Sequence, residues 1–158
     1  MQDALNKQVL IEAESSQVYL AMASWAEIQP GIDNVTSFFY QHSDEERMHM
    51  LKMIHFVNER GGFATVPALS QPQLTFPSIK HAFEALLNHE IFVSESINKL
   101  IDIALEEKDY ATHNFLQWYL RPHRYISSKF DFNSSIMEEV LQKFSLDGKI
   151  ALVTGCSR

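Results

Sequence analysis

Three glutamates interrupt apolar rows that otherwise follow helical spacing along this chain. Glu12, Glu46 and Glu90 each occupy a core-facing position, and His49 follows Glu46 at a spacing that puts both on one side of a helix. A lone buried carboxylate is costly unless it is neutralised or paired, and three of them would repel one another. A bound cation removes both costs, and carboxylate oxygens with one imidazole suit iron and its neighbours. The pattern therefore indicates a metal site inside a helical bundle, where di-iron centres are built from such residues.

Each of these residues has a simpler interpretation when it is taken alone. Most single Glu-x-x-His pairs on helices face solvent, and a glutamate near the end of a bundle can reach water. The metal hypothesis therefore depends on three helices that present glutamate at comparable depth. Apart from His49 and His123, the histidines are interpreted as surface or packing residues: His42, His55, His81, His89 and His113.

Four helical segments are needed to position these side chains. Apolar or small residues recur at alternating steps of three and four, which is typical of bundle helices. The break at 29–31 is short and makes the first two helices antiparallel, whereas the connection at 63–77 carries three prolines and is long for an ordinary loop. We expect an all-α four-helix bundle with one long crossover between the second and third helices. The expected segments run over residues 5–26, 35–56, 79–104 and 112–130.

The composition is that of one globular domain. The chain has 158 residues, of which 46% are hydrophobic and 21% are charged, so a proper core is possible and wholesale disorder is not expected. The net charge of −7 argues against general binding to nucleic acid or anionic membranes and permits attraction of cations. The single cysteine, Cys156, allows no disulfide within the chain, and neither a signal pattern nor a membrane-spanning apolar run is found. A cytoplasmic protein is the expectation.

Longer stretches of the chain resemble the non-haem bacterial ferritins. The matching stretches are IEAESSQVYLAMASWAE at 11–27, HSDEERMHML at 42–51, HE at 89–90 and DYATHNFLQWYL at 109–120. The resemblance implies a ferritin-like bundle that stores iron and oxidises Fe²⁺ to Fe³⁺ with dioxygen or peroxide, at a di-iron centre within each subunit. It also implies a homo-oligomer, which in this family is a hollow shell of twenty-four subunits.

The resemblance further implies roles for individual residues. Glu12 and His49 would bind the first iron, Glu46 would bridge the two irons, and Glu90 would bind the second. Tyr19 matches a tyrosine beside the centre that acts as a hydrogen-bond or electron donor.

The chain departs from the family in the fourth helix. The family's glutamate-rich run after NFLQWY is replaced by LRPHRYISSKFDFNSS. On the second helix, by contrast, Glu45 matches an outer carboxylate of the family's accessory iron site. His123 stands where the family has a site-facing glutamine, and it is either an iron ligand or a displaced, solvent-facing residue. Pro122 would cost ~3 kcal/mol inside an ideal helix, so a kink or break is expected near 119–122.

Two cofactors are not expected. Haem-binding bacterioferritins carry their haem-ligating methionine directly after the glutamate of the second helix, where this chain has Arg47. The ending LDGKIALVTGCSR resembles the first strand and turn of short-chain dehydrogenases, but Gly155 alone remains of the phosphate-binding loop, so nucleotide binding is not expected. We divide the chain into a bundle at 1–144 and an atypical tail at 145–158, which lacks the fifth short helix of ferritins.

Two rival functions stay open on the sequence alone. A degenerate ferritin subunit would bind one metal through Glu12, Glu46 and His49 but would oxidise it poorly. A DNA-protecting mini-ferritin is disfavoured, because such proteins hold their metal between subunits and this chain has its candidate ligands inside one bundle.

Overall fold

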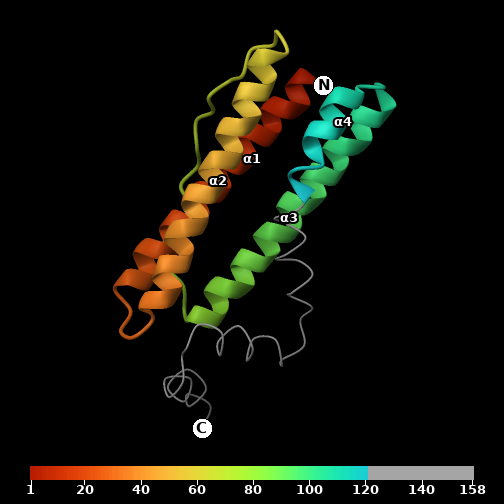
Figure 1. Ribbon diagram of the computed structural model, residues 1–158. Coiled ribbons are helices and arrows are strands. Elements are labelled where there is room, and N and C mark those ends of the chain that lie inside the picture. The colour runs from red at the N-terminus through yellow and green to blue at the C-terminus, as the bar shows by residue number, and fades with distance from the viewer. Residues whose placement is uncertain (121–158) are drawn as a thin grey trace.

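The computed structural model describes residues 1–120, and the chain forms four helices within them (Figure 1). The first two helices pack along their length as an antiparallel pair, the third packs against the first, and the fourth lies beside the third. The predicted all-α bundle is confirmed. The helices are α1 (Gln2–Glu27), α2 (Asp33–Glu59), α3 (Ile79–Glu106) and α4 (Tyr110–Leu116).

The predicted long crossover between α2 and α3 is also present. Residues 60–78 contain no helix or strand and run back along the α1–α2 pair to the far end of the bundle (Figure 1). Side chains of α1 hold this segment, since Asn6 donates to the Phe63 carbonyl at 3.1 Å and accepts from the Thr65 amide at 2.9 Å. Further along, the Ser70 hydroxyl donates to Glu14 at 2.9 Å. The crossover therefore satisfies part of its backbone with α1 side chains instead of a strand partner.

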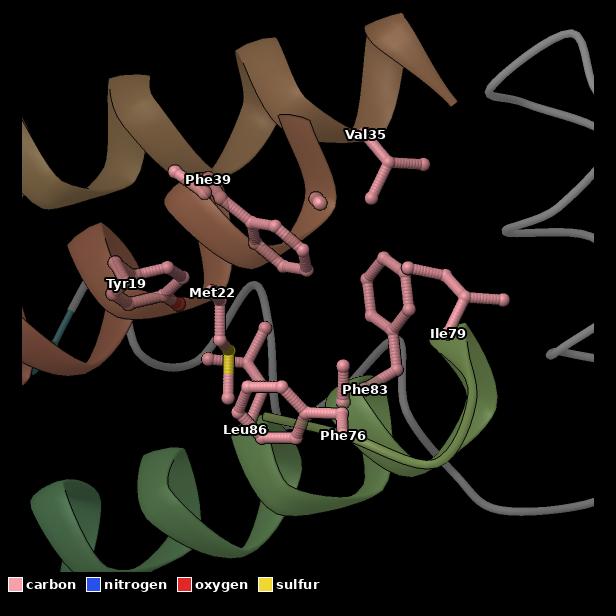
Figure 2. Close-up of a cluster of buried hydrophobic side chains, with 11 residues drawn as sticks. Tyr19, Met22, Val35, Phe39, Phe76, Ile79, Phe83 and Leu86 are labelled. Carbon is pink, nitrogen blue, oxygen red and sulfur yellow. The ribbon is translucent and has the colours of Figure 1, made fainter. Parts of the chain in front are cut away.

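The hydrophobic core forms two clusters, one toward each end of the bundle. Figure 2 shows one of them, in which Phe39 from α2 faces side chains of α1 and α3. The second cluster packs the start of α1 against the end of α2 and the later part of α3. Between the two clusters, α1, α2 and α3 each contribute buried polar residues at the same depth. The buried polar residues of these three helices are Gln8, Glu12, Ser15, Ser16, Ser43, Glu46, His49 and Glu90.

The α3–α4 connection is a tight turn. Lys108 adopts a positive φ of 56°, and the Asp109 amide then donates to the Ala104 carbonyl at 2.8 Å. Asp109 caps α4, because its carboxylate accepts from the Thr112 amide at 3.1 Å. This turn sets α4 against α3 and brings residues 118 and 119 toward α2.

The fourth helix is interrupted just before the range 119–122, where a kink or break is expected. Helix α4 ends at Leu116 and gives way to turns in which Trp118 and Tyr119 bond back three residues, to Phe115 and Leu116. The break therefore begins before the predicted range 119–122, with the tightened hydrogen bonding that is common at helix ends. Residues 121–158 lie outside the described part of the chain. The predictions for Pro122, His123, the 144/145 boundary and the tail consequently stay predictions.

None of the helices described within residues 1–120 is both long and apolar enough to cross a membrane.

Candidate metal centre

Glu12 of α1 and Glu46 and His49 of α2 form one buried cluster. Nδ1 of His49 lies 3.2 Å from Oε2 of Glu46 and 3.5 Å from Oε2 of Glu12. One ligand atom from each residue lies within 4.8 Å of the other two, a spacing at which a single ion could contact all three. Glu12 is fully buried, and Glu46 and His49 are at most 7% exposed.

The donor set of this cluster fits iron. Two carboxylates and one imidazole are ligands that iron and similar divalent ions accept. Oε2 of Glu12 is buried and has no hydrogen-bond partner among the described residues. A buried carboxylate oxygen without a partner is costly, and a metal ion at this point would supply the missing interaction.

Small side chains let α1 and α2 approach closely beside the cluster. The Ser16 hydroxyl donates to the Ser43 carbonyl at 2.8 Å, and the Ser43 hydroxyl donates back to the Ser16 carbonyl at 2.8 Å. This reciprocal pair lies about one turn from Glu12 and Glu46. It ties the two helices together at the depth where their ligands must meet.

The pKa values of His49 and Glu46 are strongly shifted in the metal-free chain. Burial acts to lower the pKa of His49, but its close pairing with the carboxylates of Glu12 and Glu46 outweighs burial and raises that pKa to about 10. Burial raises the pKa of Glu46 to about 7, with repulsion from Glu12 adding to the effect and His49 opposing it. Positive charge on His49 thus offsets carboxylate charge in a dry interior. A divalent cation could replace that positive charge.

Glu90, the fourth predicted ligand, is as deeply buried as the three cluster residues but is not one of that cluster. It is 1% exposed and accepts a 2.7 Å hydrogen bond from the Tyr19 phenol. Its charge is nevertheless near enough to help raise the pKa of Glu46. Burial and the neighbouring Glu90 raise the pKa of Tyr19 well above its ordinary value. The structure therefore brings three predicted ligands together and pairs the fourth with the predicted tyrosine.

Glu45 lies away from this cluster. Its side chain is 49% exposed and accepts a hydrogen bond from Gln41 at 2.9 Å. His42, interpreted from the sequence as a surface or packing residue, packs on Phe38 with ring centroids 4.0 Å apart and planes tilted by 39°, and its centroid lies 5.3 Å from that of Tyr19. Burial lowers the pKa of His42. These contacts are those of a packing residue, as expected for His42.

Several residues around the cluster had been given no role from the sequence. Tyr119 donates from its phenol to the His49 carbonyl at 2.8 Å, and the rings of Trp118 and His49 form a T-shaped pair with centroids 5.3 Å apart. Gln8, one turn before Glu12, donates from Nε2 to Oε1 of Glu12 at 2.7 Å. Helical spacing could have singled out Gln8, because residues four apart share a face. Nothing in the sequence relates Trp118 or Tyr119 to His49.

The fold and the cluster together define a four-helix protein with a possible metal site, whose candidate ligands lie on facing helices in the bundle core. Residues 2–131 match the family model of the ferritin-like domain, and the chain belongs to the ferritin family. A solved open-pore ferritin from the archaeon Archaeoglobus fulgidus superposes with a TM-score of 0.81 at 36% identity, over 96% of this chain and 90% of that one.

Curated bacterial proteins agree with this assignment. A probable bacterial non-heme ferritin-like protein of Haemophilus influenzae is 36% identical over 145 residues, covering 92% of this chain and 85% of that protein. A bacterial non-heme ferritin of Campylobacter jejuni is 37% identical over 116 residues, covering 73% and 69% respectively. The resemblance to non-haem bacterial ferritins noted from the sequence is confirmed.

Proposed function

We propose that this chain is an iron-storage subunit that binds Fe²⁺ at Glu12, Glu46 and His49 and oxidises it to Fe³⁺. The buried three-residue cluster carries the proposal, since a carboxylate pair with an imidazole and an unsatisfied Glu12 oxygen calls for a cation. Iron is the substrate and not a resident cofactor. Two Fe²⁺ ions release two electrons, which with two protons reduce dioxygen to hydrogen peroxide. Carboxylate oxygens are hard donors that hold Fe²⁺ and bind the harder Fe³⁺ as well.

The chain's own residues have distinct tasks in this proposal. Glu46, whose pKa is raised by burial and by the charges of both Glu12 and Glu90, would bridge the two irons. Glu90 supplies a carboxylate to the second iron, and the Tyr19 phenol orients it through the 2.7 Å bond. Glu45 as an accessory-site ligand and His123 as a second-iron ligand remain predictions. So do assembly into the family's shell and a cytoplasmic location.

A second candidate function has an observation in its favour. Glu90 lies outside the three-residue cluster and is bonded to Tyr19. A degenerate subunit that binds one metal ion and oxidises it poorly would need only Glu12, Glu46 and His49.

The two functions differ in stoichiometry and in oxygen use. The full chain, freed of metal, is titrated with Fe²⁺ without oxygen and then exposed to air. Two Fe²⁺ per chain with prompt oxygen uptake and Fe³⁺ absorbance supports the ferroxidase, whereas one Fe²⁺ with slow oxidation supports the degenerate subunit. Glu46→Gln should slow Fe³⁺ formation at least tenfold, and the exposed Glu95→Gln on α3 is the matched control. An unchanged rate in Glu46→Gln contradicts the proposal, and size-exclusion chromatography tests the shell separately.

A further inference from the structure

We infer that Gln8 is a positioning residue that holds Glu12 as a ligand through one oxygen only. Gln8 lies on α1 and is 2% exposed, so its amide cannot rely on water for its hydrogen bonds. Its Nε2 donates to Oε1 of Glu12 at 2.7 Å. The inference deepens the proposed function, because it concerns the same metal site and rests on it.

The orientation of the Gln8 amide is fixed from both sides. An ionised carboxylate only accepts hydrogen bonds, so the amide nitrogen must face Glu12 and the amide oxygen must face away. That oxygen meets the Ser96 hydroxyl of α3 at 2.9 Å. The same hydroxyl lies 2.7 Å from the Val93 carbonyl, and its one proton is shared between the two acceptors. If the Gln8 amide were flipped, its oxygen would face Oε1 of Glu12, and neither oxygen could donate a hydrogen bond to the other.

The two oxygens of Glu12 consequently differ. Oε1 is bonded to Gln8, whereas Oε2 has no hydrogen bond and lies 3.5 Å from Nδ1 of His49. The terminal torsion of a glutamate is broad, so an unrestrained carboxylate could rotate or offer both oxygens to one ion. The Gln8 bond restrains this rotation and keeps Oε2 directed toward His49 and Glu46.

The chain of bonds also links α3 to a ligand on α1. Ser96 contacts Gln8, and Gln8 contacts Glu12, so the position of α3 is coupled to the geometry of the cluster. Outer partners of metal ligands typically change metal affinity by about 10–100-fold when removed. Gln8 therefore acts on the metal through Glu12 without touching it.

The test measures binding of Co²⁺ to the metal-free full chain by visible absorption without oxygen, a readout that needs no turnover. Gln8→Met keeps the length of the side chain and removes the amide, and it should raise the Co²⁺ dissociation constant about 10–100-fold. Ser96→Ala should raise it in the same direction by a smaller factor. Ser94→Ala is the matched control, because the Ser94 hydroxyl is buried on the same helix without a hydrogen-bond partner among the described residues.

The outcomes separate this inference from the proposed function. Co²⁺ binding by the unmodified chain that is lost in Glu46→Gln establishes the site. Given that site, an unchanged dissociation constant in both Gln8→Met and Ser96→Ala overturns the inference alone, even if thermal stability falls. If Gln8→Met does not fold, Ser96→Ala against Ser94→Ala decides the question. A chain that binds no Co²⁺ at all overturns both the site and the inference.

Discussion

Tyr19 of α1 donates a 2.7 Å hydrogen bond from its phenol to Oε1 of Glu90 of α3, across the centre of the bundle. Both side chains are essentially inaccessible to water. A carboxylate in such a place needs hydrogen bonds to offset its lost hydration, and the phenol supplies one. Glu90 is thereby held by Tyr19 and is not one of the three residues of the cluster of Glu12, Glu46 and His49. One hydroxyl group thus affects both the stability of the metal-free bundle and the position of a proposed ligand.

Tyr19→Phe should destabilise the metal-free protein by about 1.5–3 kcal/mol, the range for a lost hydrogen bond to a charged group. Urea unfolding followed by circular dichroism measures the change. Tyr40→Phe is the matched control, because the Tyr40 phenol donates to Glu27 at the same 2.7 Å distance but at the exposed surface. The control should shift the midpoint little. Equal shifts in the two variants would mean that the burial of the Tyr19–Glu90 pair has no energetic consequence.

Tyr119→Phe should cost about 1 kcal/mol, because it leaves the His49 carbonyl without the phenol that bonds to it at 2.8 Å. The phenyl ring still packs against His49, so Co²⁺ affinity should stay within about twofold of the original, far less than removal of a metal ligand's own partner would cause. Unfolding and Co²⁺ titration are measured on the same sample. Tyr110→Phe, at an exposed position of α4, provides the comparison. Large loss of Co²⁺ affinity in Tyr119→Phe would instead make the hydroxyl part of the metal site.

Asp109 gives a prediction about pH. Burial acts to raise the pKa of Asp109, but hydrogen bonds from Thr112 and the charge of Arg60 outweigh it and hold that pKa below its ordinary value. The folded state therefore favours the ionised carboxylate. Its stabilisation is present above the unfolded pKa of about 3.9 and is lost as the pH falls through the lower folded value.

Asp109→Ala should accordingly cost about 1 kcal/mol at pH 7, the typical value of a helix N-cap. The gap between the variant and the original protein should narrow as the solution is acidified below pH 4. Asp109→Asn keeps a capping side chain and loses the ion pair with Arg60, so its loss at pH 7 should be smaller. Urea midpoints at several pH values test both. A gap that widens in acid would reverse the assigned direction of the pKa shift.

Lys108 is held in the left-handed region with φ 56°, where side chains other than glycine are strained. Lys108→Gly should therefore raise stability by about 0.5 kcal/mol, since relief of that strain exceeds the extra freedom of glycine in the unfolded chain. The same substitution at Lys99, inside α3, should lower stability by about 0.5–1 kcal/mol. Thermal or urea unfolding of both variants shows whether the signs are opposite. A loss at both positions would contradict the strain at Lys108.

The sequence anticipated the helices and the depth of the key residues. Apolar positions spaced by three and four predicted α1, α2 and α3, and Glu12, Glu46 and Glu90 on those rows are buried in the structure. A residue at a core-facing position of a helix is buried together with its apolar neighbours, even when its own side chain is polar. The long crossover followed equally from its three prolines. Helix α4 ends at Leu116, close to the break expected near 119–122, and the expected segment beyond residue 120 lies outside the described residues.

By itself, then, the sequence determined the class of fold and which carboxylates face the core, because both depend on local periodicity and side-chain polarity. Tertiary structure alone decided how those carboxylates are partnered. Spacing along α1 and α3 did not reveal that Tyr19 would bond to Glu90, or that Gln8 would stand between Glu12 and Ser96. Such contacts depend on the relative rotation and offset of helices that are distant in sequence. Displacements of about 1 Å make or break a hydrogen bond of this kind.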